Sequence, residues 1–239
     1  MTAMVGLFPT CLGDAVYPRV ARDAERVLRA AGADPALVRG ATCCGQPAWN
    51  SGHVAGARRI ARPTLRAMAD HESVVVPSGS CAAMIRLHWR ELFHGDRDEA
   101  GAERVAARTF ELSQYLVEQL GVAAIGSPLG RAVTYHDSCH MLRELRLYEP
   151  PRQLLRAVAE LQELPRGERC CGFGGAFSVR YPDVSTAMAD DKLASVKASG
   201  AETVVSADPG CIMQIEGRAG RTGAPVRVVH LATLLAEAL

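Results

Sequence analysis

The sequence contains almost no lysine. Lys192 and Lys197 are its only lysines among 27 basic residues, and acidic side chains reduce the net charge to +1. No stretch concentrates basic side chains, although a surface that binds nucleic acid or anionic lipid normally needs such a concentration. We therefore expect no nucleic-acid partner.

Long apolar runs are missing as well. No segment reaches the roughly 18 uninterrupted apolar residues that are typical of a transmembrane helix. Residues 1–11 also lack the basic side chains that begin a secretory signal. We expect a cytoplasmic protein without a transmembrane segment, in which any membrane contact is made through partners.

Cysteine, in contrast, is abundant. The eight positions are Cys11, Cys43, Cys44, Cys81, Cys139, Cys170, Cys171 and Cys211. The reducing cytoplasm disfavours structural disulfides, and the Cys-x-x-Cys motif of thiol–disulfide enzymes is absent. Single free cysteines are commonly small buried residues, but that interpretation fits eight ordered positions poorly.

The cysteines form two sets with the same order. Each set has one cysteine, then Cys-Cys-Gly, then a last cysteine, with gaps of 31 and 36 residues in the first set and 30 and 39 in the second. Equivalent cysteines are offset by 128, 127 and 130 residues. This spacing indicates an internal duplication, with one domain at 1–122, another at 123–239, and the join within 121–130.

Each half alternates short apolar runs with amphipathic stretches. The runs at 5–8, 74–76, 132–135, 204–205 and 226–229 predict buried strands, and the stretches at 16–31 and 187–199 predict helices. The fold class expected is α/β, as two pseudo-symmetric Rossmann-like halves that each have a mostly parallel sheet flanked by helices. The first half carries about ten extra residues within 86–108, which are charged and predicted to lie on the surface.

Four cysteines directly follow predicted strands: Cys11, Cys81, Cys139 and Cys211. Ligands gather at the carboxyl ends of parallel strands, and the N-terminus of a following helix favours a thiolate. We therefore predict that each half gathers its four cysteines around one metal centre, so that all eight are ligands.

Four thiolates in a reducing compartment fit either an iron–sulfur cluster or zinc. Adjacent cysteines reach two irons of a cluster more easily than one small tetrahedral ion, so iron–sulfur is favoured and zinc stays the alternative. His53, His136 and His140 lie near cysteines and are interpreted as hydrogen-bonding neighbours. No nucleotide fingerprint or nucleophile–base motif is present, which favours electron transfer over independent catalysis, with a zinc-stabilised interaction subunit as the alternative.

Short peptide blocks around the cysteines match a known family. The blocks are Cys-Leu-Gly-Asp at 11–14, Cys-Cys-Gly-Gln-Pro-Ala at 43–48, Asn-Ser-Gly at 50–52, Ser-Gly-Ser-Cys at 78–81, Cys-Cys-Gly-Phe-Gly-Gly at 170–175 and Phe-Ser-Val at 177–179. With them, the chain resembles the CCG cysteine-rich domain family over nearly its whole length. The resemblance is closest to the lactate utilization protein A branch, and it extends to the cysteine-rich subunit of heterodisulfide reductase and to the glycolate oxidase iron–sulfur subunit.

The resemblance implies an iron–sulfur electron-transfer subunit without independent activity. It implies as partners a ferredoxin-like iron–sulfur subunit and a third small subunit, in a lactate utilization complex that oxidises L-lactate to pyruvate. Glycolate or another 2-hydroxy acid would require the same cysteines. The fullest family motif ends in Cys-x-x-Cys, whereas Met84 and Gln214 stand at its last positions here. The expected cofactor is therefore one [4Fe–4S] cluster per half, with zinc in one half as the alternative.

Overall fold

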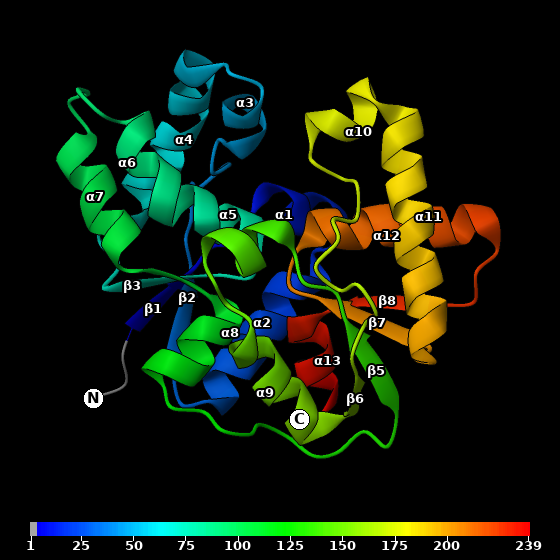
Figure 1. Cartoon of the computed structure of the whole chain (residues 1–239). Coiled ribbons are helices and arrows are strands. Elements are labelled where there is room, and N and C mark those ends of the chain that lie inside the picture. The colour runs from blue at the N-terminus through cyan, green and yellow to red at the C-terminus, as the bar shows by residue number, and fades with distance from the viewer. Residues whose placement is uncertain (1–3) are drawn as a thin grey trace. The chain divides into compact units, whose positions relative to one another are not determined.

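The computed structural model describes residues 4–239. The chain divides into two compact units, Met1–Gly121 and Val122–Leu239 (Figure 1). Within the described residues, no helix is long and apolar enough to cross a membrane.

The first unit begins with β1 (Met4–Leu7) and ends in a π-helix, η2 (Tyr115–Gln119). The elements between them are α1 (Cys11–Val16), α2 (Arg19–Ala30), β2 (Asp34–Leu37), α3 (Gln46–Asn50), α4 (Val54–Met68), β3 (Ser73–Val76), α5 (Gly79–Ala83), η1 (Met84–His88), α6 (Trp89–Leu92), α7 (Glu99–Ala107), β4 (Thr109–Glu111) and α8 (Leu112–Gln114).

The second unit begins with β5 (Ala132–Tyr135) after an irregular segment, and ends in α13 (Leu231–Glu237). Its other elements are η3 (His140–Glu144), α9 (Glu149–Val158), β6 (Glu160–Gln162), α10 (Ala176–Arg180), α11 (Pro182–Ser199), β7 (Thr203–Ser206), α12 (Pro209–Thr222) and β8 (Arg227–His230).

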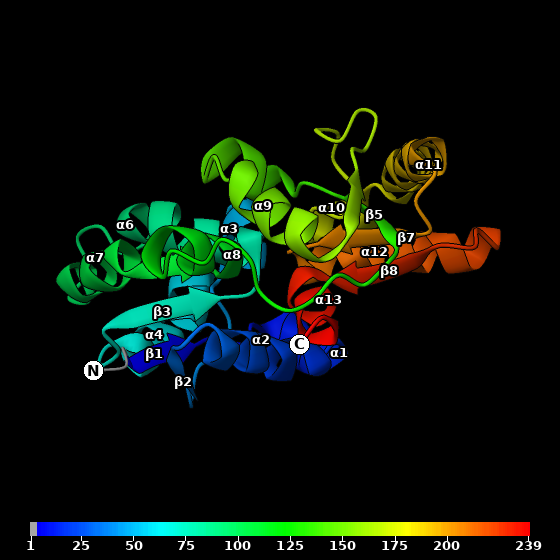
Figure 2. The same ribbon diagram turned by 90° about the horizontal axis from the view of Figure 1, so that it is seen from below.

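Each unit contains one four-stranded parallel sheet. The strand orders are β2-β1-β3-β4 and β6-β5-β7-β8, so every strand of the first sheet has an equivalent in the second. Figure 2 shows each sheet flanked by helices, and the predicted fold class is confirmed. Because the strands are parallel, their carboxyl ends lie at one edge of each sheet, where the cysteine-bearing loops begin.

The sheet cores come from the apolar runs that the sequence displays. Val74, Val75 and Val76 in β3 and Val204 and Val205 in β7 are fully buried. Strands buried on both faces are expected to be continuously apolar rather than alternating, which matches these runs.

The segment 86–108 lies largely on the surface as predicted, but it also contributes to the core. Its charged residues alternate with the fully buried Trp89, Leu92 and Phe93, and the Trp89 and Phe93 rings pack edge to face with centroids 5.8 Å apart. The sequence prediction missed this buried face, because the charge density of the segment hid apolar residues at helical spacing. The insertion therefore enlarges the first unit's core.

The last strand of each unit ends on a residue that caps the next helix. Glu111 accepts hydrogen bonds from the backbone N–H groups of Ser113 at 2.7 Å and Gln114 at 3.2 Å. His230 accepts one from Ala232 at 3.0 Å through Nδ1. Burial raises the pKa of Glu111 to about 7, against the lowering effect of these hydrogen bonds.

This buried carboxyl predicts a pH dependence of stability. The pKa of Glu111 is higher in the folded chain than in the unfolded chain, so its contribution is fully present below about pH 4.5 and is lost as the pH rises through about 7. The loss is at most ~3 kcal/mol. Urea unfolding of the full chain from pH 5 to 8 should show this decline, and Glu111→Gln should flatten it.

Glu118→Gln is the matched control, because it makes the same substitution at an exposed side chain near Glu111 in the sequence. It should keep the wild-type slope. An equal slope in wild type and Glu111→Gln would contradict the assignment.

Candidate metal centres

In the first unit, two cysteines lie at helix starts directly after strands. Cys11 is the first residue of α1, and the N-cap Thr10 has a positive φ of 64° while its hydroxyl accepts a hydrogen bond from Gly13 N–H at 3.2 Å. Cys81 lies in the first turn of α5, where Ser78 Oγ accepts from its N–H at 3.3 Å. Polar caps after β1 and β3 therefore place these thiols at one edge of the sheet.

The Cys43–Cys44 pair lies on a loop that neighbouring side chains fix in place. Thr64 Oγ1 donates to the Cys43 carbonyl at 2.9 Å, and Trp89 Nε1 donates to the Cys44 carbonyl at 2.9 Å. Gly45 adopts φ +90°, and a Cβ there would lie 2.9 Å from a backbone oxygen. This glycine lets the loop turn sharply while its N–H points at the Cys43 sulfur, 3.4 Å away.

The four sulfurs of the first unit form two close pairs. Cys11 Sγ and Cys43 Sγ are 3.6 Å apart, and Cys44 Sγ and Cys81 Sγ are 3.3 Å apart. Cys44 and Cys81 are buried, whereas Cys11 and Cys43 are half-buried. The structure thus brings the four predicted residues together, with one exposed side and one buried side.

The electrostatics of this set favour one thiolate and oppose further ones. Hydrogen bonds from the Cys11 and Cys44 thiols lower the pKa of Cys43 to about 3. The same contacts with Cys43 raise the pKa values of Cys11 and Cys44, and burial adds to the rise. Holding all four as thiolates therefore requires cations among them, and metal binding would displace the remaining protons.

The second unit repeats the arrangement. Thiol contacts from Cys139 and Cys171 lower the pKa of Cys170 to about 2, and Cys171 in turn contacts Cys211. The Gly172 N–H lies 3.4 Å from Cys170 Sγ, as in the first unit. Four thiols again share one site, which fits the donor set of an iron–sulfur cluster or zinc.

The Gly172 loop is held by α11 and α12. Gly172 has φ +88°, and a Cβ there would lie 2.6 Å from the Ser185 carbonyl oxygen. Ser185 Oγ donates to the Gly172 carbonyl at 2.8 Å, and Gln214 Nε2 donates to that Oγ at 2.9 Å. Gln214, at the position of the absent fifth thiol, therefore supports the loop through Ser185.

His136 is the unexpected member of the second site. Its side chain is fully buried, and both ring nitrogens lack a hydrogen-bond partner among the described residues. Within residues 4–239, donor atoms of three residues lie within 4.8 Å of one another at one place: His136, Cys171 and Cys211. The expectation that His136 is a hydrogen-bonding neighbour was wrong. His140 instead lies 3.7 Å from the Glu144 carboxylate.

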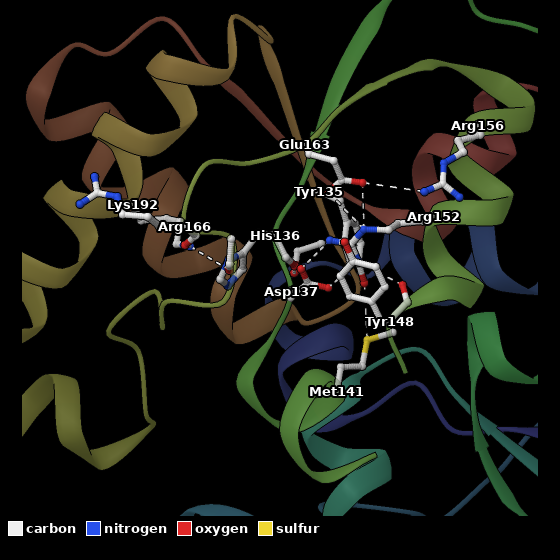
Figure 3. Close-up of polar contacts among 12 residues, drawn as sticks. Tyr135, His136, Asp137, Met141, Tyr148, Arg152, Arg156, Glu163, Arg166 and Lys192 are labelled. Atoms are coloured by element: carbon white, nitrogen blue, oxygen red, sulfur yellow. Dashed lines mark hydrogen bonds and ion pairs between the residues drawn. The ribbon is translucent and has the colours of Figure 1, made fainter. Parts of the chain in front are cut away.

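A buried ion pair fixes the segment that carries His136 and Cys139. Arg152 makes two hydrogen bonds to the Asp137 carboxylate, at 2.7 and 2.8 Å, and its Nε donates to both Glu163 carboxylate oxygens, at 3.0 and 3.2 Å (Figure 3). Its guanidinium carbon lies 3.6 Å from the centroid of the Tyr148 ring. Burial lowers the pKa of Arg152, but the bonds to Asp137 and Glu163 outweigh this effect and raise it overall.

Lys192 places a second buried cation near the same site. From α11, its ammonium group donates to the carbonyls of Gly167 at 3.2 Å and Arg166 at 3.5 Å, just before the Cys170–Cys171 pair. Burial lowers its pKa, whereas the charges of Cys171 and Cys211 raise it. The rarity of lysine in the sequence was the only signal that could have singled it out.

Comparison with known proteins agrees with the duplicated site. A family model described as a cysteine-rich domain, CCG, matches residues 5–86 and 133–216. Each match contains one complete set of four cysteines. The chain belongs to this family.

Two relatives are similar over nearly their whole length. The chain is 44% identical to "Lactate utilization protein A" of Geobacillus kaustophilus (strain HTA426), over 97% of this chain and 98% of that protein. It is 45% identical to the protein of the same name in Shouchella clausii (strain KSM-K16), with the same coverage. The resemblance to the lactate utilization protein A branch of the CCG family is thereby confirmed.

A solved structure shares the fold. A hypothetical protein from Helicobacter pylori matches with a TM-score of 0.68 at 8% identity, over 98% of this chain and 48% of that one. At this identity the likeness concerns the fold alone.

Proposed function

We propose that this chain is an iron–sulfur electron-transfer subunit of a complex that oxidises L-lactate to pyruvate. Each unit holds one [4Fe–4S] cluster through its four cysteines. The observation that carries the proposal is the convergence of four thiols in each unit of a chain 44% identical to a relative named for lactate utilization.

The adjacency of Cys43 and Cys44 supports a cluster over a single ion, because neighbouring side chains reach two irons of a cluster more easily than one small tetrahedral ion. Cys43 Sγ lies 3.6 Å from Cys11 Sγ, and Cys44 Sγ lies 3.3 Å from Cys81 Sγ. The Cys43 and Cys44 thiols also contact each other, so the adjacent pair links all four thiols of the first unit. Four cysteine thiolates are the ligand set that a [4Fe–4S] cluster takes.

The reaction fixes how many electrons such a subunit must accept. Oxidation of lactate to pyruvate breaks the C2–H and O–H bonds and releases two electrons and two protons. A [4Fe–4S] cluster normally carries one electron at a time. Two centres in one chain can therefore accept both electrons of one substrate molecule.

The proposed partners are a ferredoxin-like iron–sulfur subunit and a third small subunit. In the proposed complex, these partners bind the substrate and take its electrons, which then pass to this chain. We place the complex in the cytoplasm, with any membrane contact made through partners.

The second unit carries an observation that favours zinc there. The compact trio of His136, Cys171 and Cys211 is a donor set that zinc also accepts. A second candidate function is therefore a zinc-stabilised non-catalytic subunit, and the same complex acting on glycolate or another 2-hydroxy acid is a variant of the first.

Metal and sulfide analysis of the full chain purified without air tests the proposal. We expect brown protein with about eight irons and eight acid-labile sulfides, and an electron paramagnetic resonance signal on reduction. Colourless protein that takes up no iron on anaerobic reconstitution would refute it. Stoichiometric zinc without sulfide in both units would establish the second candidate.

Substrate identity is tested separately in the complex with both partner subunits. Reduction of the chain's centres by L-lactate, but not by glycolate at equal concentration, supports the lactate assignment. Faster reduction of the centres by glycolate than by L-lactate would assign glycolate as the substrate and would leave the cluster assignment unchanged.

A further inference from the structure

We infer that His136 is a metal ligand of the second unit in place of one of its four thiolates, so that the second centre has mixed nitrogen and sulfur donors whereas the first has thiolates alone. The inference rests on the proposed function, because it assumes that the thiol sets hold metal. Its basis is the trio of donor atoms from His136, Cys171 and Cys211, which lie within 4.8 Å of one another.

The surroundings of His136 leave its imidazole without another partner. Both ring nitrogens are buried and unbonded among the described residues, and leaving a buried polar group without a partner is destabilising. The polar groups nearby are engaged elsewhere: Asp137 binds Arg152, and Lys192 donates to the carbonyls of Arg166 and Gly167. In Figure 3 the ring points away from Asp137 and Arg152, towards the side of Lys192. A metal ion shared with the two thiolates satisfies one of these nitrogens.

The backbone on both sides of the ring is fixed, which prearranges the imidazole. The His136 N–H donates to the Val205 carbonyl at 2.8 Å, and Ser206 Oγ donates to the His136 carbonyl at 3.2 Å. Asp137, the next residue, is held by the Arg152 ion pair. Ligands oriented by such supporting bonds lose little entropy when metal binds.

The first unit has no counterpart to this imidazole. Its equivalent residue is Phe8, whose N–H donates to the Val75 carbonyl at 2.9 Å just as His136 donates to Val205. Phe8 is buried and offers no ligand atom. The duplication has therefore produced two centres with different donor sets on the same scaffold.

Different donors imply different reduction potentials. A neutral imidazole in place of a thiolate removes one negative charge from the centre, and histidine ligation raises the potential of an iron–sulfur centre relative to thiolate ligation. The buried Lys192 ammonium acts in the same direction, because it offsets negative charge on Cys171 and Cys211. The second centre should therefore have the higher potential and hold the electron when the chain is half-reduced.

Pulsed electron paramagnetic resonance on full-length protein tests the ligand directly. Cys44→Ala serves as the background, because it silences the first centre and leaves the signal of the second. We expect a ¹⁴N coupling of a coordinated imidazole in this background, its loss on adding His136→Ala or His136→Cys, and a lower potential in His136→Cys. His140→Ala is the matched control, because His140 is next to Cys139 but lies against Glu144, and it should keep the coupling.

Replacement by cysteine keeps the experiment decisive if alanine prevents folding, because it supplies a thiolate at the same position. Retained metal without the nitrogen coupling in His136→Cys supports the inference. If the second unit holds zinc, X-ray absorption should show one imidazole shell that His136→Cys removes. An iron signal without ¹⁴N coupling in the Cys44→Ala background would overturn the ligand but leave the proposed function intact, whereas absence of metal from both units would overturn both.

Discussion

Alanine in place of Cys44 should empty the first metal centre and leave the second one loaded. Cys44 is buried and lies between Cys43 and Cys81, so its removal leaves the remaining thiols without the link between the two sulfur pairs. Iron and acid-labile sulfide in anaerobically purified protein should fall by about half, from about eight irons to about four. Cys171→Ala should cause the same loss in the second unit.

The two substitutions control for each other, because each removes the equivalent thiol from one unit of the same chain. The residual spectra should differ: the Cys44→Ala protein keeps only the centre that His136 adjoins, and the Cys171→Ala protein keeps only the all-cysteine one. Loss of all iron from either variant would contradict the assignment of four ligands to each unit.

The sequence was informative about the central strands and about the edge strand β8, and silent about the other three edge strands. Residues 132–135 are β5 as predicted, and β7 extends the predicted 204–205 by one residue at each end. The strands β2, β4 and β6 were not predicted, because they lie at sheet edges or carry Pro35, Glu111 or Glu160 in place of continuous apolar side chains. Edge strands depend on pairing with a neighbour, which local composition does not reveal.

Helix boundaries show a similar limit. The predicted helix at 16–31 is α2, which begins later, at Arg19, because Val16 ends α1 and Tyr17 and Pro18 separate the two helices. The predicted helix at 187–199 begins earlier, at Pro182, where proline occupies the first turn. Both differences arise at a Tyr-Pro dipeptide. Proline favours the first turn of a helix, so the helix begins there, whereas the apolar pattern alone does not mark the start.

The cysteines could be predicted from their spacing, because the duplication repeats it. The buried charged residues around them could not be predicted, because they meet only in the folded chain. Arg152 and Asp137 are 15 residues apart and meet only when α9 packs beside the β5 end. Lys192 lies 21 residues after Cys171 and approaches it through the length of α11. For His136 the sequence showed proximity to Cys139, but only the structure shows that no other group meets its ring.

Replacing Arg152 by methionine should destabilise the second unit by about 3–5 kcal/mol, because it leaves the Asp137 carboxylate buried without its partner. Both side chains are almost fully buried, and Arg152 is only 2% exposed. Methionine retains much of the side-chain volume beside Tyr148. The decrease in unfolding free energy therefore reports the lost charge and hydrogen bonds rather than a cavity. Urea unfolding of the full chain should show the second unit unfolding at lower denaturant.

Arg156→Met is the matched control, because Arg156 is exposed on the same helix and pairs with the exposed Glu149. Its effect should stay within about 0.5 kcal/mol. The double variant Arg152→Met, Asp137→Leu removes the uncompensated charge and should recover a large part of the lost stability. Equal stability of Arg152→Met and Arg156→Met would contradict the role of the ion pair.

The same variant connects stability to the metal centre. Asp137 is two residues before Cys139 and one after His136, so release of its carboxylate frees the backbone that positions both side chains. Arg152→Met should therefore lose iron from the second unit faster than wild type when a chelator is added, while the first unit keeps its iron at the wild-type rate. The ion pair contacts residues of the second unit alone. Loss of iron from both units at equal rates would therefore contradict a role of the ion pair in holding the second centre.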